Sequence, residues 1–236
     1  MGRKASANRV YTVPAAGAVY YSSSYYDTGG GVYTPPSGTK ELYVWITGAG
    51  GGGSRGGNNY NHGGGGASGC TIFAHITDVA ASYNYNIGSG GQEGQSDHAS
   101  ASAGGNTTFG NLTANAGEGG IGHTGGDAAR GNGGDTSADG TIGSNAARGV
   151  KFRGNFAMPS GGGNQDNDRP NGASWGQASF WGVGGRGGNL NDSGRSHGQP
   201  GYVWGSGGGP SSKRSDQSTG NAGVGAGGMI YIQEYK

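Results

Sequence analysis

The sequence predicts an all-β/irregular fold, in which a small β-layer caps a glycine-rich bundle of polyglycine-II-like helices with long loops and essentially no α-helix. Three observations predict it. Of 236 residues, 60 are glycine, the clearest apolar patterns alternate as in half-buried strands, and no segment keeps the period of a helix. Glycine loses more backbone entropy on folding than any other residue, so the packing unit of this fold should be the backbone itself.

Composition restricts the kind of core and the kinds of partner. Leu, Ile, Val and Phe together supply 26 residues, which is too few for an ordinary side-chain core throughout the chain. The formal net charge is only +1. This balance argues against a disordered chain and against a nucleic-acid partner, because both usually come with a large net charge.

The cysteine content and the apolar runs bear on where the protein is made. Cys70 is the single cysteine, which excludes an intramolecular disulfide and fits folding in a reducing cytosol. No apolar run is long enough to cross a membrane, and Met1–Asn8 lacks the apolar stretch of a secretory signal. We therefore expect synthesis in the cytoplasm, no membrane insertion, and release by lysis if the protein acts outside a cell.

Four segments alternate as half-buried strands should: Glu41–Thr47, Thr71–Thr77, Met229–Tyr235 and, more weakly, Ser82–Ile87. In the first of them Leu42, Val44 and Ile46 share one face. Residues 78–81 can turn the chain between the second segment and the weak one. We expect the four segments to pair as one small sheet, with the C-terminal segment returning to the layer that the N-terminal part opens.

Glycine interrupts every window between Gly88 and Gly228, which leaves no room for a sustained helix. The strict G-X-Y repeat of collagen is absent, but extended threefold helices without side chains can still pack closely and bond laterally. We expect such helices to satisfy one another's peptide groups. Valine at Gly51 or Gly185 should then be severely destabilising.

Several motifs that usually carry chemistry occur here without their structural context. Gly48, Gly50 and Gly53 have G-x-G-x-x-G spacing, but no helix follows to bind a pyrophosphate. Ser174 lies in a G-x-S-x-G match without the strand and helix of a nucleophile elbow. The histidines show no paired-ligand spacing, and Asp166 with Asp168 is better explained by a solvated turn than by a glycosidase pair. We expect no enzyme activity, no cofactor and no metal site.

Loops between the glycine runs are rich in aromatic and polar residues, the composition of recognition surfaces held on rigid scaffolds. The alternative for each ring is that it covers the side of the bundle. The receptor-binding candidates are Tyr60, Phe152, Arg153, Phe156, Trp175, Trp181, Arg195, Tyr202 and Trp204.

The order of segments resembles the glycine-rich adhesins and glycine-rich terminal domains of bacteriophage tail fibres. The resemblance covers most of the chain and rests on the ordered set Val32–Gly53, Thr71–Ile87 with the following GSGG, Ala103–Gly120 and Gly225–Tyr235. It implies a β-layer that caps packed polyglycine helices, with loops at the distal tip that bind an outer-membrane protein or a surface glycan.

The resemblance also implies a place on a virion. Residues 32–236 would form the adhesin domain, and residues 1–31 would attach it to another virion protein through the Tyr-rich segment Val19–Asp27. The alternative for that segment is an edge strand of the domain itself. A homotrimer is compatible with this arrangement. The alternative is a capsid decoration or head-fibre protein that uses the same fold without a receptor role.

Overall fold

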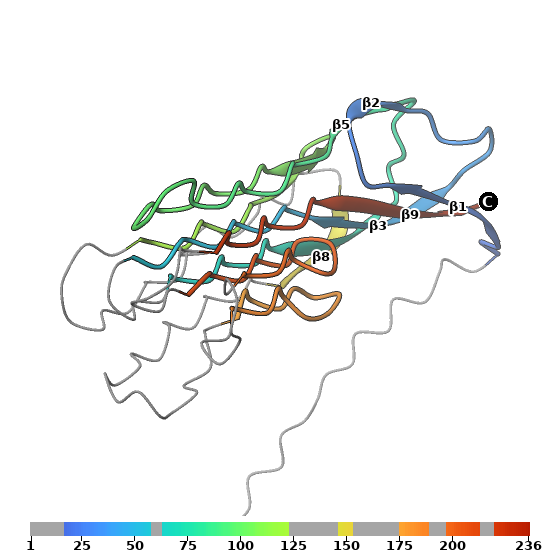
Figure 1. Ribbon diagram of the computed structural model, residues 1–236. Coiled ribbons are helices and arrows are strands. Elements are labelled where there is room, and N and C mark those ends of the chain that lie inside the picture. Colours follow the sequence, from blue (N-terminus) through green and yellow to red (C-terminus); the bar gives the residue numbers. More distant parts are fainter. Residues whose placement is uncertain (1–16, 58–62, 123–145, 153–174, 189–196, 213–219) are drawn as a thin grey trace, which may run out of the picture.

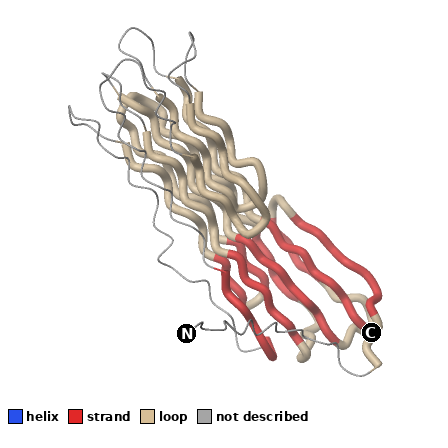
Figure 2. The backbone as a smooth tube through the Cα atoms, turned by 90° about the horizontal axis from the view of Figure 1, so that it is seen from below, coloured by secondary structure: helices blue, strands red, loops and turns tan. Residues whose placement is uncertain are grey.

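The computed structural model describes residues 17–57, 63–122, 146–152, 175–188, 197–212 and 220–236, and the structural statements below concern these residues. The strands gather at one end of an elongated molecule (Figure 1). Glycine-rich segments run side by side from the strands toward the other end (Figure 2). None of the described residues is helical, which confirms the predicted all-β/irregular class.

The strands form two antiparallel sheets. The larger sheet has the order β1 (Tyr20–Tyr26), β9 (Met229–Tyr235), β3 (Glu41–Thr47), β4 (Thr71–Ile76) and β8 (Ala146–Phe152). The smaller sheet has the order β2 (Gly30–Tyr33), β5 (Tyr83–Asn86), β6 (Thr107–Phe109) and β7 (Leu112–Ala114).

Three of the four predicted strands pair as expected, since β3 lies between β9 and β4. The fourth prediction is wrong, because β5 belongs to the smaller sheet. Tyr83 and Ile87 explain the difference, since both are buried within the apolar core. A strand added at an edge of the larger sheet would leave the apolar face of that sheet uncovered, whereas a second layer covers it.

The apolar core fills the space between the two sheets. Leu42, Val44 and Ile46 of β3 are fully buried, as their alternation predicts. The smaller sheet contributes mainly rings, and Tyr83 stacks on Phe109 with 4.7 Å between centroids. The core is therefore aliphatic on one side and aromatic on the other.

One carboxylate lies inside this core. Glu234 of β9 is 1% exposed and accepts hydrogen bonds from Tyr33 Oη, Ser22 Oγ and Ser24 Oγ, each at 2.9 Å. Three donors replace the water that a buried carboxylate loses, which is the condition for burying such a group. The bonds also tie β1 and β2 to β9.

Two core tyrosines should make the fold sensitive to alkali. Burial, together with the hydrogen bond to Glu234, raises the pKa of Tyr33 above its ordinary value of 10.0, and burial also raises the pKa of Tyr83. Tyrosines of the unfolded chain lose their phenol proton near pH 10, whereas the folded protein keeps the protons of Tyr33 and Tyr83 to higher pH. Stability should thus be fully present below pH 10 and fall as pH rises above it.

Urea midpoints measured between about pH 8 and pH 11 test this expectation. Tyr33→Phe should lower the urea midpoint at pH 8, because the hydrogen bond to Glu234 is lost. The midpoint of this variant should also fall less steeply as pH rises, because it lacks one phenol whose pKa is raised in the folded protein. The same decline in both proteins would contradict a role for Tyr33 in the alkaline transition.

The glycine-rich bundle is held by backbone hydrogen bonds with a repeat of three residues. Within residues 49–54, two N–H groups that are three positions apart donate to the same neighbouring segment. Gly50 and Gly53 donate to residues 223–226, and Gly51 and Ser54 donate to residues 64–67. Ala49 and Gly52 donate to residues 102–105. The carbonyl groups repeat likewise: Gly50 and Gly53 accept from 91–94, Ala49 and Gly52 from 117–120, and Gly51 and Ser54 from 208–211. Residues 49–54 are thus bonded on all sides.

A second segment, 205–211, occupies a similar position. Its N–H groups donate to segments that include residues 51, 177 and 199, and its carbonyls accept from segments that include residues 66, 185 and 223. A repeat of three is what an extended threefold helix produces; the polyglycine II conformation itself stays a prediction. Peptide groups thus satisfy one another where a side-chain core would normally lie.

Close approach of the backbones explains the glycine content of the central segment. An added Cβ would overlap the carbonyl oxygen of Ser206 at Gly50, of Glu118 at Gly51, and of Gln92 at Gly52. Ala49 and Ala67 are nevertheless fully buried, so some positions between the segments accept a methyl group. Glycine is needed only where a carbonyl of the neighbouring segment faces the Cα.

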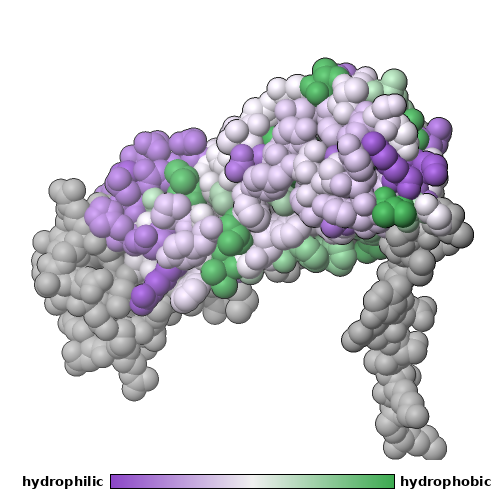
Figure 3. Space-filling model, turned by 90° about the vertical axis from the view of Figure 1, so that its right-hand side faces the viewer, coloured by the Kyte–Doolittle hydropathy of each residue, from purple (hydrophilic) through white to green (hydrophobic). Residues whose placement is uncertain are grey.

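The surface is unevenly polar. Most of the described surface visible in Figure 3 is of intermediate hydropathy and is drawn in pale colours. Strongly hydrophilic residues gather beside the grey region at one end, and hydrophobic residues form small separate patches. Among the described residues no helix is long and apolar enough to cross a membrane.

Candidate functional site

The first candidate surface is a row of aromatic side chains at the junction of the larger sheet and the bundle. We call it the aromatic band and define it as Tyr25, Trp204, Trp181, Phe180 and Phe152. Successive ring centroids in that order are 5.4, 6.1, 5.0 and 4.8 Å apart. Four of the rings are 38–49% exposed, and Trp181 is half-buried.

Two tight turns hold the central rings of the band. Trp181 lies in the turn 179–182, and its Nε1 donates to Thr47 Oγ1 at the end of β3 over 2.8 Å. Trp204 lies in the turn 202–204, where Ser206 Oγ donates to the Val203 carbonyl at 2.6 Å. Gly205 follows with a φ of 71°, a left-handed conformation that favours glycine. The rings are therefore fixed although they are exposed.

A hollow of about 250 Å³ opens beside the band and is lined by Tyr202, Val203, Trp204 and Ala226. Its walls are mainly apolar, and Tyr202 at its rim is 57% exposed. Sites for drug-sized ligands usually have roughly 300–1,000 Å³. The hollow therefore fits a single small ring.

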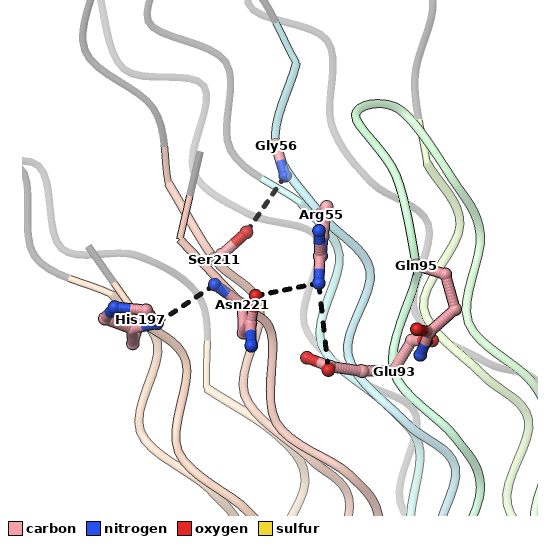
Figure 4. A network of polar contacts seen from close by, with 7 residues as sticks. All are labelled: Arg55, Gly56, Glu93, Gln95, His197, Ser211 and Asn221. Atoms are coloured by element: carbon pink, nitrogen blue, oxygen red, sulfur yellow. Dashed lines mark hydrogen bonds and ion pairs between the residues drawn. The ribbon is translucent and has the colours of Figure 1, made fainter. Parts of the chain in front are cut away.

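The second candidate surface lies at the tip, the end of the bundle opposite the sheets, and is drawn in Figure 4. Arg55 Nη2 donates to Asn221 Oδ1 at 2.8 Å and lies 3.8 Å from Glu93 Oε1. The backbone N–H of Asn221 donates to His197 Nδ1 at 3.0 Å. We call Arg55, Glu93, His197 and Asn221 the tip clamp, because they join separate glycine-rich segments.

The tip clamp lies beside residues that flank three ranges outside the described part of the chain. Arg55 precedes the range 58–62, His197 directly follows the range 189–196, and Asn221 follows the range 213–219. Ser211, which precedes this last range, accepts from the Gly56 N–H at 3.3 Å. The ends of three connections are therefore held together at one end of the scaffold.

Comparison with known proteins assigns the chain to a family. A family model described as a glycine-rich domain matches residues 24–235. The chain belongs to this glycine-rich domain family. The match begins within β1 and ends with β9, so both sheets and the bundle lie within the family region. No curated protein matches the chain.

The glycine-rich domain brings some of the predicted recognition residues together and separates others. Phe152, Trp181 and Trp204 all belong to the aromatic band, and Tyr202 lies beside Trp204 at the hollow. Trp175 is 53% exposed and lies on the bundle, where its carbonyl faces Gly65. The candidates outside the described residues are Tyr60, Arg153, Phe156 and Arg195.

The position of the band differs from the distal loops that the resemblance implied. The turns that carry Trp181 and Trp204 lie where the bundle meets the larger sheet, as the bonds from Trp181 to Thr47 and from Gly205 to Gly227 show. Sequence reasoning also missed Phe180 and Tyr25 as members. Two adjacent aromatic residues, Phe180 and Trp181, between glycine runs could have indicated that Phe180 is exposed beside Trp181. Nothing near Tyr25 in the sequence indicates a contact with Trp204.

Metal ligands do not gather in the described part of the glycine-rich domain, where no group of three His, Cys, Asp or Glu side chains is placed to hold an ion.

Removal of the tip clamp should loosen the tip without unfolding the domain. Arg55→Ala should lower the free energy of unfolding by only about 1 kcal/mol, because Arg55 is partly exposed to screening solvent. Arg55 Nε and Glu93 Oε2 are also buried without a partner among the described residues, which lowers the net gain further. Amide hydrogen exchange at Asn221 should nonetheless accelerate, because the side chain of Asn221 loses the hydrogen bond from Arg55 that anchors it.

Arg55→Lys is the matched variant, since it keeps the charge but cannot bond Asn221 and Glu93 with the same fork geometry. It should accelerate exchange at Asn221 by an intermediate amount. Unchanged exchange in Arg55→Ala would mean that the clamp does not order the tip.

Proposed function

We propose that this glycine-rich domain is the receptor-binding adhesin of a tailed bacteriophage, a virion protein that recognises a bacterial surface protein or glycan. The observation that carries the proposal is the tip clamp, which holds the ends of three connections at one end of the scaffold. Recognition residues are commonly placed on loops that a rigid scaffold positions.

The backbone interior of the bundle supports this proposal. Substitutions in the glycine-rich segments are restricted by facing carbonyl groups, as at Gly51 and Gly52. In the proposal the receptor contacts lie outside these segments, so that their side chains can change without loss of the interior. A protein that must follow a changing receptor benefits from this separation of scaffold and contact residues.

The other end of the domain suits attachment to a second virion protein. Strand β1 is an edge strand of the larger sheet, and Tyr20 and Tyr21 on it are more than half exposed. An edge strand presents unpaired backbone groups that a partner strand can bond. In the proposal this end binds the particle while the tip faces the host.

Binding of the purified domain to cells tests the proposal. A fluorescently labelled domain should bind the strain on which a phage encoding this chain grows, and an excess of unlabelled domain should slow adsorption of that phage. Tyr60→Ala and Arg195→Ala, in the ranges 58–62 and 189–196 that described residues of the tip flank, should each weaken cell binding by about tenfold. Melting temperatures should stay close to that of the unsubstituted protein.

Tyr20→Ala is the matched control, because this tyrosine is 52% exposed at the sheet end and should leave cell binding unchanged. Absence of binding to any host cell would make the adhesin proposal wrong. Antibodies against the domain that label phage heads in electron micrographs, rather than tails, would identify a capsid decoration instead.

A further inference from the structure

The aromatic band is an exposed surface of apolar rings at the junction of the larger sheet and the bundle. Phe180 is 49% exposed, Tyr25 43%, Phe152 39% and Trp204 38%, although apolar rings are usually buried. Contiguous exposed apolar surface on a folded domain commonly marks a binding site. The fixed turns 179–182 and 202–204 reduce the entropy that binding would cost.

The size of the band argues against a protein partner. An aromatic side chain has an area of roughly 150–250 Å², so the four rings at about two-fifths exposure offer on the order of 300 Å². A stable protein interface buries about 800 Å² on each partner. The exposed area of the band therefore suits a small or narrow ligand better than a helix or a sheet.

The chemistry of the band points to an uncharged ligand with apolar faces and many hydroxyl groups. The faces of aromatic rings are electron-rich and attract the C–H groups on the flat face of a pyranose. Successive ring planes are inclined by 39–85° to one another, so sugars along the band would contact ring faces and ring edges in turn. Polar groups are available at one end, where Tyr25 Oη donates to Asp27 Oδ2 at 3.2 Å.

We propose that the aromatic band binds an uncharged glycan chain, with one pyranose seated in the hollow beside Trp204 and further sugars lying along the band. The inference goes beyond the proposed function, which places recognition at the tip, and it rests on that function only for the source of the glycan, a bacterial surface. The carboxylate of Asp27 accepts hydrogen bonds from sugar hydroxyls, and Tyr202 covers the outer side of the seated ring.

Titration with oligosaccharides tests the inference without cells. Maltohexaose, cellohexaose and chitohexaose are titrated into the full chain by calorimetry, with tryptophan fluorescence as a second readout. At least one of them should bind and change the emission. Trp204→Ala should weaken that binding by about tenfold or more, and Tyr202→Ala, at a more exposed position, should weaken it as well.

Val32→Ala is the control, since Val32 is an exposed apolar residue on β2 of the smaller sheet and belongs to neither candidate surface, and it should leave the affinity unchanged. Absence of binding to all three sugars would overturn the inference, and so would equal losses in Trp204→Ala and Val32→Ala. Self-association of the domain that Tyr202→Ala abolishes would do the same, because the band would then be a protein interface. Oligosaccharide binding without binding to cells would contradict the proposed function alone.

Discussion

Alanine at Gly51 should prevent the bundle from forming or lower the free energy of unfolding by more than about 4 kcal/mol. The N–H of Gly51 donates to the Ala67 carbonyl and its own carbonyl accepts from Gly208, each at 2.9 Å, while an added Cβ would overlap the Glu118 carbonyl. The methyl group can be accommodated only if two backbones separate, and this breaks the bonds on either side. Thermal unfolding followed by circular dichroism should show a Tm lower by about 10 °C or more.

Gly227→Ala is the matched control within the same bundle. A Cβ on Gly227 would lie 3.7 Å from the nearest atom, the Gly88 carbonyl oxygen, which is an ordinary van der Waals distance. This variant should stay within about 1 kcal/mol of the unsubstituted protein. Equal stability of Gly51→Ala and Gly227→Ala would mean that the glycine-rich segments are linkers and do not form a packed interior.

Loss of the buried carboxylate of Glu234 should be the second most damaging change, at about 3–5 kcal/mol. Glu234→Ala leaves the hydroxyl groups of Tyr33, Ser22 and Ser24 without their acceptor and opens a void between the two sheets. Urea denaturation gives the free energy directly, and the change should appear in the midpoint with little change in slope.

Glu234→Gln separates the lost bonds from the lost volume. Glutamine keeps the shape and one acceptor oxygen, so this variant should lose roughly 1–2 kcal/mol. A Glu234→Ala protein as stable as Glu234→Gln would indicate that the three hydroxyl groups find other partners and that the carboxylate is not needed to join β1 and β2 to β9.

The sequence predicted those parts of the fold that depend on local patterns. Alternation placed Leu42, Val44 and Ile46 on one face, and glycine density indicated a backbone-packed bundle without helix. Strand β8 (Ala146–Phe152) was missed because Gly149 interrupts its alternation, and β6 and β7 were missed because three residues are too few to show a period. Neither the existence nor the order of the smaller sheet could be predicted for this reason.

The arrangement of segments in the bundle lies beyond local patterns. Nothing near Gly50 in the sequence indicates that its N–H bonds to Ala226, because the partner lies far along the chain. The same holds for the candidate sites. The single rings Trp181 and Trp204 could be identified by type, but their alignment with Tyr25 depends on how distant turns meet.

The repeat of three in the backbone hydrogen bonds restricts how the chain can change in length. Because neighbouring N–H groups of residues 49–54 point to different segments, insertion of one residue would turn every later N–H toward the wrong neighbour. An insertion or deletion of three residues would restore the phase and only lengthen or shorten the segment by one turn. Within the glycine-rich segments, gains and losses of residues should therefore be tolerated in multiples of three.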